Sequence, residues 1–159
     1  MATYQTSYGI NKARGLPGQV STLEESNRIT RTVETAAGIA FGQPVQRGTA
    51  DRGAAILSTG DFLGLAILHV AVAPDAANPD AYPQYSELGI MTEGTMYVTA
   101  GGTVAPGDLV YWDAATGKYS NLNTDVEVPG ATFEETAGDG DIVEIALMAR
   151  PLTRIDAIA

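Results

Sequence analysis

A predicted β-hairpin between residues 104 and 120 constrains the fold more than any other stretch of the chain. Pro106-Gly107 is a turn dipeptide, because proline presets φ at the second turn position and glycine accepts a positive φ at the third. Leu109 to Trp112 is bulky and aromatic, as a half-buried strand prefers. Asp113 to Gly117 has the composition of a short hairpin loop, and Lys118 to Ser120 begins the return strand. This stretch predicts local strand pairing.

Turn residues recur along the whole chain and divide it into short apolar segments. The 159 residues include 18 glycines and 8 prolines, which favours short strands over long helices. In the longest apolar run, Phe62 to Val72, both the odd-numbered and the even-numbered positions are mostly apolar. This pattern predicts a strand that is buried on both faces. A capping-box pattern at Thr22 predicts one or two helical turns at most. Eight to ten short strands predict an all-β fold, either a small β-barrel or a β-sandwich.

Residues 1 to about 25 do not follow the period of a strand or a helix. One interpretation is a flexible terminus without a fixed structure. The apolar and aromatic content favours an extended N-terminal arm that lies on a neighbouring subunit or a partner, because disordered segments are poor in such residues. We assign residues 1–25 to this arm and residues 26–159 to a single β-rich domain. The candidate partner-binding residues of the arm, two of them basic, are Tyr4, Tyr8, Ile10, Lys12, Arg14 and Leu16.

The charge of the chain excludes several classes of partner. There are 9 basic and 19 acidic residues, so the formal net charge is −10. An acidic chain is repelled by phosphate backbones and anionic lipid, so we expect no nucleic-acid partner and no membrane partner. Cysteine is absent, which excludes disulfides and thiolate zinc sites. The N-terminus lacks the pattern of a signal peptide, which predicts synthesis in a cytoplasm.

No constellation of catalytic residues is recognisable. His69 is the single histidine and lies in the longest apolar run, where a core or edge position is the expected interpretation. The acidic stretch from Glu134 to Asp141 does not have the spacing of a calcium-binding EF-hand and predicts a solvated loop. Nucleotide-binding glycine motifs and a serine nucleophile elbow are absent. We therefore expect no catalytic, cofactor-binding or metal-binding residues, and a protein that is not an enzyme.

Aromatic residues in two stretches are candidates for contact between subunits. The proline-rich stretch from Ala73 to Tyr85 predicts a surface loop that reaches a neighbour. In the hairpin, Tyr111 and Trp112 point to opposite faces, so one packs in the core and the other is available as a surface anchor. The candidate subunit-contact residues are Tyr82, Tyr85 and Trp112.

The order and spacing of several motifs resemble those of tailed-bacteriophage capsid cement, or head decoration, proteins. The resemblance covers roughly residues 15 to 149, and the motifs are Gly15-Leu16-Pro17-Gly18-Gln19, Ile39-Ala40-Phe41-Gly42-Gln43-Pro44-Val45, Phe62-Leu63-Gly64-Leu65-Ala66, Gly94-Thr95-Met96-Tyr97-Val98, Val104-Ala105-Pro106-Gly107-Asp108-Leu109-Val110-Tyr111-Trp112 and Thr116-Gly117-Lys118-Tyr119. The resemblance implies a non-enzymatic protein that binds the outer capsid surface of the virion. It implies a homo-oligomer, with a trimer favoured, that bridges subunits of the major capsid protein.

Two other interpretations stay open at this stage. The first is a glycan-binding β-domain of a viral fibre or adhesin, which would use an exposed Trp112 or Tyr111 and calcium in the acidic loop. The second is a trimeric β-barrel enzyme, which would need a carboxylate-bound magnesium site and phosphate-binding groups. The residues show no motif for the second.

Overall fold

The computed structural model describes residues 14–70 and 79–148 of the chain. Strands form all of its regular secondary structure, so the fold is all-β as predicted. The strands are β1 (Asn27–Val33), β2 (Ile39–Ala40), β3 (Pro44–Arg47), β4 (Gly53–Ile56), β5 (Phe62–Ala66), β6 (Ala81–Tyr82), β7 (Glu87–Thr99), β8 (Leu109–Asp113), β9 (Lys118–Ser120), β10 (Val126–Phe133) and β11 (Ile142–Leu147).

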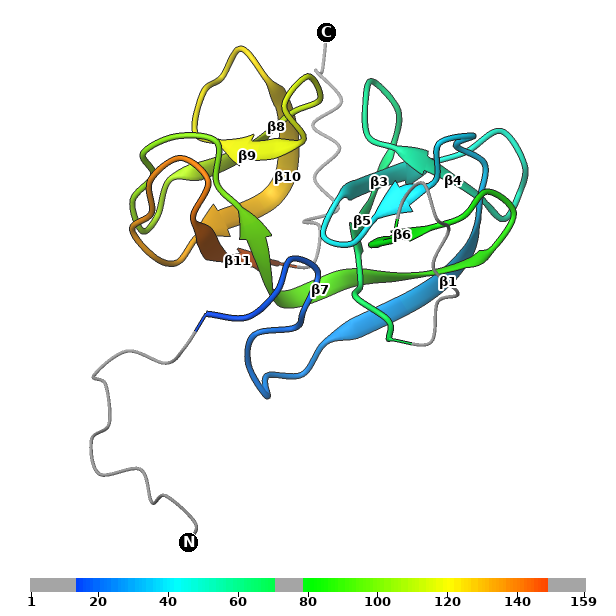
Figure 1. The fold of residues 1–159 in the computed structure, drawn as a ribbon, viewed down its shortest axis with the longest axis horizontal. Helices are drawn as coiled ribbons and strands as arrows, with labels where there is room; N and C mark the ends of the chain where they lie inside the picture. Colours follow the sequence, from blue (N-terminus) through cyan, green and yellow to red (C-terminus); the bar gives the residue numbers. More distant parts are fainter. Residues whose placement is uncertain (1–13, 71–78, 149–159) are drawn as a thin grey trace, which may run out of the picture.

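Five of these strands close into a barrel, which we call the barrel lobe (Figure 1). The strand order is β1-β4-β3-β5-β7, and β1 pairs with β7 to complete the circle. The β1–β4 pairing is parallel and the other pairings of the barrel are antiparallel. Closure removes most sheet edges and encloses a core that includes Val33, Val45, Leu88 and Ile90.

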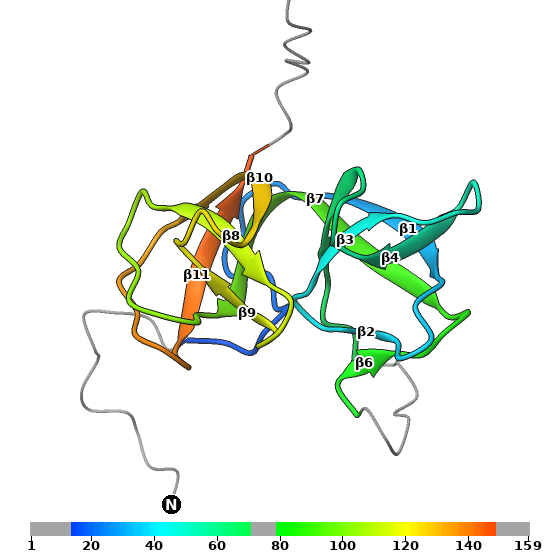
Figure 2. The same cartoon turned by 90° about the horizontal axis from the view of Figure 1, so that it is seen from above.

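The remaining large strands form a second unit, the hairpin lobe, on the far half of β7 (Figure 2). The order continues from β7 through β11, β10 and β8 to β9. A parallel bridge from Ala100 to Tyr119 brings β9 back beside the end of β7. Both lobes therefore depend on β7, which passes from one to the other at Gly94, where φ is +131°. A side chain there would meet Ser26 Cβ at 2.9 Å.

The core of the hairpin lobe extends to the outer face of the barrel. Phe62 and Leu65 of β5 pack with Trp112 and Phe133 in one continuous buried cluster. The Tyr119 hydroxyl donates a hydrogen bond to the Gly42 carbonyl in the turn before β3. The two lobes are therefore joined by apolar packing and by a buried hydrogen bond as well as by β7.

Several local predictions are confirmed and others are wrong in their boundaries. The hairpin of β8 and β9 lies where the sequence placed it. The strand predicted to run from Phe62 to Val72 ends at Ala66, although it is buried on both faces as predicted. Residues Glu87–Thr99 form one continuous strand, β7.

Two further predictions of local structure are corrected. The predicted surface loop at 73–85 contains β6, which is buried and pairs with β2; residues 71–78 lie outside the described residues. No helix follows Thr22. Its hydroxyl does accept the Glu24 amide at 3.3 Å, but it also bonds Thr95 at 2.6 Å, and the chain continues into β1.

Candidate functional site

The described part of the N-terminal arm begins with a tight turn. Gln19 N donates to Leu16 O at 3.0 Å, and Pro17 and Gly18 occupy the two central positions. Gly18 has a φ of +81°, as the third position of a type II turn requires. The turn sets the direction in which the arm enters the fold.

Residues 18 to 21 of the arm then run along β7 and are held by backbone hydrogen bonds. Gly18 N donates to Tyr97 O at 2.8 Å, Tyr97 N to Gln19 O at 2.9 Å, and Ser21 N to Thr95 O at 3.1 Å. On the other side, Leu68 N donates to Gly18 O at 2.7 Å. The arm thus bridges the hairpin-lobe half of β7 and the segment that leaves the barrel after β5.

The arm covers the outer face of β7 in the hairpin lobe. Tyr97 and Thr95 are both buried, although they point away from the core that Met96 and Val98 fill. The Thr22 and Thr95 hydroxyls bond each other at 2.6 Å. We call residues 14–22 the arm seat, since they hold the described part of the arm against β7.

The first residue of the arm seat binds the acidic side of the hairpin lobe. Arg14 Nη2 donates to Thr136 O at 3.1 Å. Its guanidinium lies 3.7 Å from a carboxylate oxygen of Glu135 and 3.9 Å from one of Asp141. The basic arm therefore meets an acidic surface of its own chain. These ion pairs are partly exposed, so each contributes little by itself.

The candidate arm residues are distributed between the arm seat and the residues before it. Tyr4, Tyr8, Ile10 and Lys12 lie outside the described residues. Arg14 is half-exposed in its ion pairs, and the Leu16 side chain is 62% exposed at the turn. Their capsid-binding role stays a prediction.

The candidate subunit-contact residues separate clearly by burial. Tyr82 and Trp112 are each 2% exposed and belong to the cores of the two lobes, so their rings serve packing within the chain. Of the pair on β8, Trp112 is thus the core residue and Tyr111 the half-exposed one. Tyr85 is 76% exposed and is the one of the three whose side chain is open to solvent. Its contact with a neighbouring subunit stays a prediction.

Tyr85 is held in a backbone conformation that few side chains adopt. Its φ is +65°, the left-handed region. Tyr85 N donates to Val33 O at 2.8 Å, and Gln84 Nε2 donates to Glu34 O at 3.0 Å, so the surrounding loop fixes the residue. Its ring borders a groove of about 520 Å³ that Arg52 also lines. The sequence carries no local signal for this conformation, since tyrosine has no preference for positive φ.

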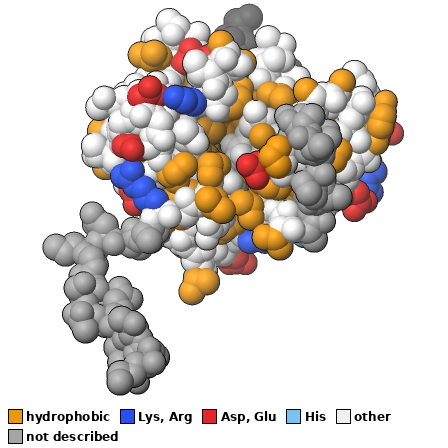
Figure 3. Space-filling view, in the orientation of Figure 1, with side chains coloured by type: hydrophobic (Ala, Val, Ile, Leu, Met, Phe, Trp, Pro, Cys, Tyr) orange, Lys and Arg blue, Asp and Glu red, His pale blue; other side chains and the backbone are white. Residues whose placement is uncertain are grey.

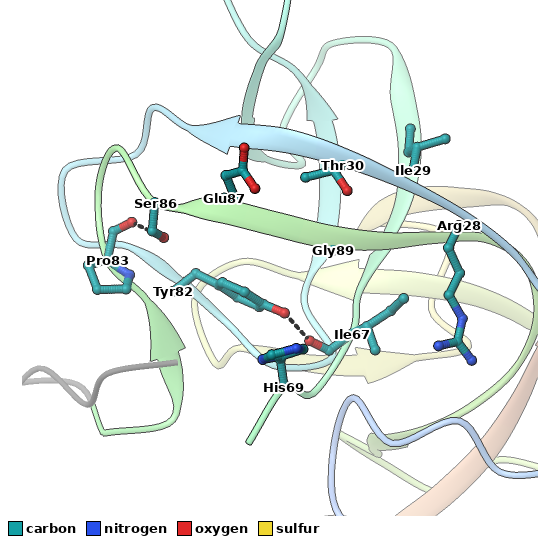
Figure 4. Close-up of a pocket in the computed structure, with 10 residues that line it drawn as sticks. All are labelled: Arg28, Ile29, Thr30, Ile67, His69, Tyr82, Pro83, Ser86, Glu87 and Gly89. Atoms are coloured by element: carbon teal, nitrogen blue, oxygen red, sulfur yellow. Dashed lines mark hydrogen bonds between the residues drawn. The ribbon is translucent and has the colours of Figure 1, made fainter. Parts of the chain in front are cut away.

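His69 lies at the surface and not in the core. It borders an open groove of about 580 Å³ over β1 and β7, together with Arg28, Ile67 and Glu87 (Figure 4). The Tyr82 hydroxyl, which lies in this groove, donates to Ile67 O at 2.7 Å and is satisfied (Figure 4). Among the described residues, no three His, Cys, Asp or Glu side chains are placed to hold a metal ion.

The loop between β3 and β4 is organised by one carboxylate. Glu34 accepts hydrogen bonds from Thr49 N and Ala50 N, each at 2.8 Å, and from Thr49 Oγ1 at 3.0 Å. The Thr49 and Ala50 amides hold the pKa of the Glu34 carboxyl below its ordinary value of 4.5. Gly53 leaves room for this carboxylate, because a Cβ there would lie 1.7 Å from Glu34 Oε1.

The lowered pKa of Glu34 predicts that the β3–β4 loop loosens in acid. The depressed folded-state pKa contributes stability that is present above pH 4.5 and is lost as the pH falls through the folded-state pKa. We expect the hydrogen-exchange protection factors of Thr49 and Ala50 to fall over that range in the wild-type protein. In Glu34→Gln they should be several-fold lower at neutral pH and nearly independent of pH. Equal protection in both proteins would contradict this.

Large apolar side chains are exposed at several places on the surface. Hydrophobic side chains gather across the middle of one face, where the two lobes meet (Figure 3). The large side chains that are most exposed come from the arm seat, loops, strand ends and β8: Leu16, Leu23, Val70, Tyr85, Leu109, Leu122 and Met148. Within the described residues, no helix has the length and apolar character needed to cross a membrane.

Comparisons with known proteins identify the family. A family model described as structural cement protein (E217 gp24/Pam3 gp6) matches residues 4–148. The chain belongs to this family. The predicted resemblance is therefore confirmed, and the structural cement protein family gives the chain a structural role in the phage capsid and a place in the virion. No match was found among the curated proteins.

Two solved structures are similar to this member of the structural cement protein family. A chain from the capsid of Myoviridae phage XM1 is similar with a TM-score of 0.69 and 17% identity, over 91% of this chain and 97% of that chain. The head fibre gp8.5 N base of bacteriophage phi29 matches with a TM-score of 0.44 and 12% identity, over 77% of this chain and 94% of that one. The first similarity supports the all-β fold, and the second is too low to carry an argument.

Proposed function

We propose that this chain binds the outer surface of a phage capsid and cements neighbouring subunits of the major capsid protein as a homo-oligomer, with a trimer favoured. Membership of the structural cement protein family supports the capsid role. The arm seat is the observation that carries the finer proposal. It holds residues 14–22 across both lobes, so the residues before it are attached to the protein at a fixed place. Such an arm orders on binding and covers a wide surface.

The chemistry of this role needs no active site. Many modest contacts, repeated on a symmetric shell, give avidity without a single strong site. The tyrosines and Ile10 of the arm supply apolar contact area, and Lys12 supplies a charge. Of the two aromatic residues that the glycan-binding interpretation would use, Trp112 is buried and not available to stack on a sugar ring, whereas Tyr111 is half-exposed. A glycan array with and without a chelator discriminates between this interpretation and the proposed function, since a cement protein should bind none of the glycans.

Deletion of residues 1–13 tests the proposal. The arm seat remains in this variant, so its thermal unfolding should match that of the wild-type protein. We expect occupancy on purified heads that lack this protein to fall strongly, measured by co-sedimentation, because the contacts of Tyr4, Tyr8, Ile10 and Lys12 are removed. Unchanged occupancy would show that residues 1–13 do not contribute to head binding. Wild-type protein that does not bind such heads would overturn the proposed function.

A further inference from the structure

One edge of β1 is not covered by another strand. β7 pairs with β1 from Asn27 to Thr32, whereas β4 reaches only Thr32 and Val33 on the opposite edge. Within residues 14–70 and 79–148, no strand pairs with that edge between Asn27 and Arg31. The barrel is therefore closed at one end of β1 and open at the other.

The hydrogen bonds of β1 show which backbone groups point to the open edge. Thr32 N donates to Arg52 O on the β4 side, and Val33 N donates to Ser86 O on the β7 side. Amides alternate between the two edges of a strand, so the Thr30 amide points away from β7 like that of Thr32. The Thr30 carbonyl accepts from Arg31 Nη1 at 2.9 Å, and no hydrogen bond to the Thr30 amide is found in the described structure.

A groove of about 310 Å³ lies beside this edge. Apolar side chains from three strands line it, namely Ile29 of β1, Leu63 of β5 and Leu147 of β11, with the exposed Met148 next to them. Ile29 and Arg31 lie on the same face of β1 because side chains alternate along a strand. A strand added to β1 would place alternate side chains in this groove.

Two arginines give the groove its charge. Arg31 and Arg47 both line it, and neither forms an ion pair within the described residues. Arg31 Nε is buried without a hydrogen-bond partner there. The carboxylate in the groove, Glu93, accepts a hydrogen bond from Asn27 Nδ2 at 2.7 Å. The groove therefore offers unpaired positive charge above an apolar floor.

We propose that the open edge of β1 binds an extended segment of the capsid subunit, which adds a strand to the barrel and places apolar and acidic side chains in this groove. Strand addition combines backbone hydrogen bonds with pockets for alternate side chains. The positive charge of Arg31 and Arg47 favours an acidic segment in the groove. The arm of a second copy has the wrong sign, since it carries Lys12 and Arg14 and no acidic residue before Glu24. This inference rests on the proposed function.

Two substitutions test the site by independent routes. Thr30→Pro removes the free amide without touching the β1–β7 ladder, and Arg47→Glu reverses one charge of the groove. We expect each to weaken binding to heads that lack this protein about tenfold or more. Thr30→Val keeps the amide, and Arg28→Glu makes the same charge change on the other face of β1. Both controls should bind like the wild-type protein.

The outcomes separate this inference from the proposed function. Thermal unfolding shows whether each variant is folded. If Thr30→Pro does not fold, the binding of Arg47→Glu to heads tests the edge site by itself. Wild-type binding by both variants, while the wild-type protein itself binds heads, would overturn the edge site and leave the proposed function intact. A change in self-association without a change in head binding would assign the edge to a second copy and overturn the proposal as well. Protection of the Thr30 amide from exchange on heads would support it.

Discussion

Trp112→Ala is expected to lower the free energy of unfolding by about 3–5 kcal/mol, the usual cost of truncating a buried tryptophan. Trp112 is 2% exposed and its ring centroid lies 5.0 Å from that of Tyr119, with the rings tilted by 58°. Tyr119 in turn bonds the Gly42 carbonyl of the barrel lobe. The cavity would therefore loosen the junction between the lobes as well as the hairpin. Chemical denaturation measures the change.

Two further substitutions define what Trp112 contributes. Trp112 Nε1 is buried without a hydrogen-bond partner in the described structure, so Trp112→Phe loses no polar contact there. It should cost less than Trp112→Ala, about 1–2 kcal/mol, because the cavity that it leaves is smaller. Tyr85→Ala, at an exposed ring, should change stability by no more than about 0.5 kcal/mol. If Trp112→Ala were as mild as Tyr85→Ala, the assignment of Trp112 to the core would be wrong.

Gly18→Ala is expected to release the arm from β7. A Cβ on Gly18 would lie 2.7 Å from Gly42 N and 2.8 Å from Phe41 Cβ, and φ is +81° at this residue. Left-handed backbone and overpacking against a fixed neighbour together cost about 2–4 kcal/mol. The variant can avoid this cost if the arm seat detaches from β7. The amides of Tyr97 and Leu68, which donate to Gln19 and Gly18, should then exchange faster with solvent.

The head occupancy of Gly18→Ala tests the contribution of the arm seat independently of residues 1–13. Residues 1–13 are intact in this variant, yet their attachment point is lost, so head occupancy should fall. Gly102→Ala is the matched control, because a Cβ there meets nothing within 4 Å. That variant should keep wild-type exchange and occupancy. Normal protection of Tyr97 and Leu68 in Gly18→Ala would show that the seat tolerates the methyl group.

Local features of the fold were predictable from the sequence. The β8–β9 hairpin is specified by neighbouring residues, namely Pro106-Gly107, a run of bulky residues and a glycine that ends the loop. Met96 and Val98 likewise alternate along β7 as strand side chains do, and both belong to the core of the hairpin lobe. These features depend on interactions within about ten residues, and periodicity reports such interactions directly.

Long-range pairing could not be read from the pattern. Barrel closure depends on β1 meeting both β4 and β7, and β7 begins more than fifty residues after β1 in the sequence. The arm seat was missed because its residues have no strand period, although Gly18 and Gly42 in the quoted motifs mark the close approach of two turns. Tyr82 was assigned to a loop since its partner strand, β2, is only two residues long.

The sharing of β7 by two cores has a mechanical consequence. If one lobe is held by one capsid subunit and the other by its neighbour, a pull between them is carried lengthwise by β7. Its cross-strand hydrogen bonds lie nearly perpendicular to that direction, so they bear the load together in shear and do not open one after another. The arm seat and the Tyr119–Gly42 bond span the same junction and work in parallel with the strand. In this arrangement the protein resists a pull along β7, the direction in which the shell would load it, better than a pull that separates its strands one hydrogen bond at a time.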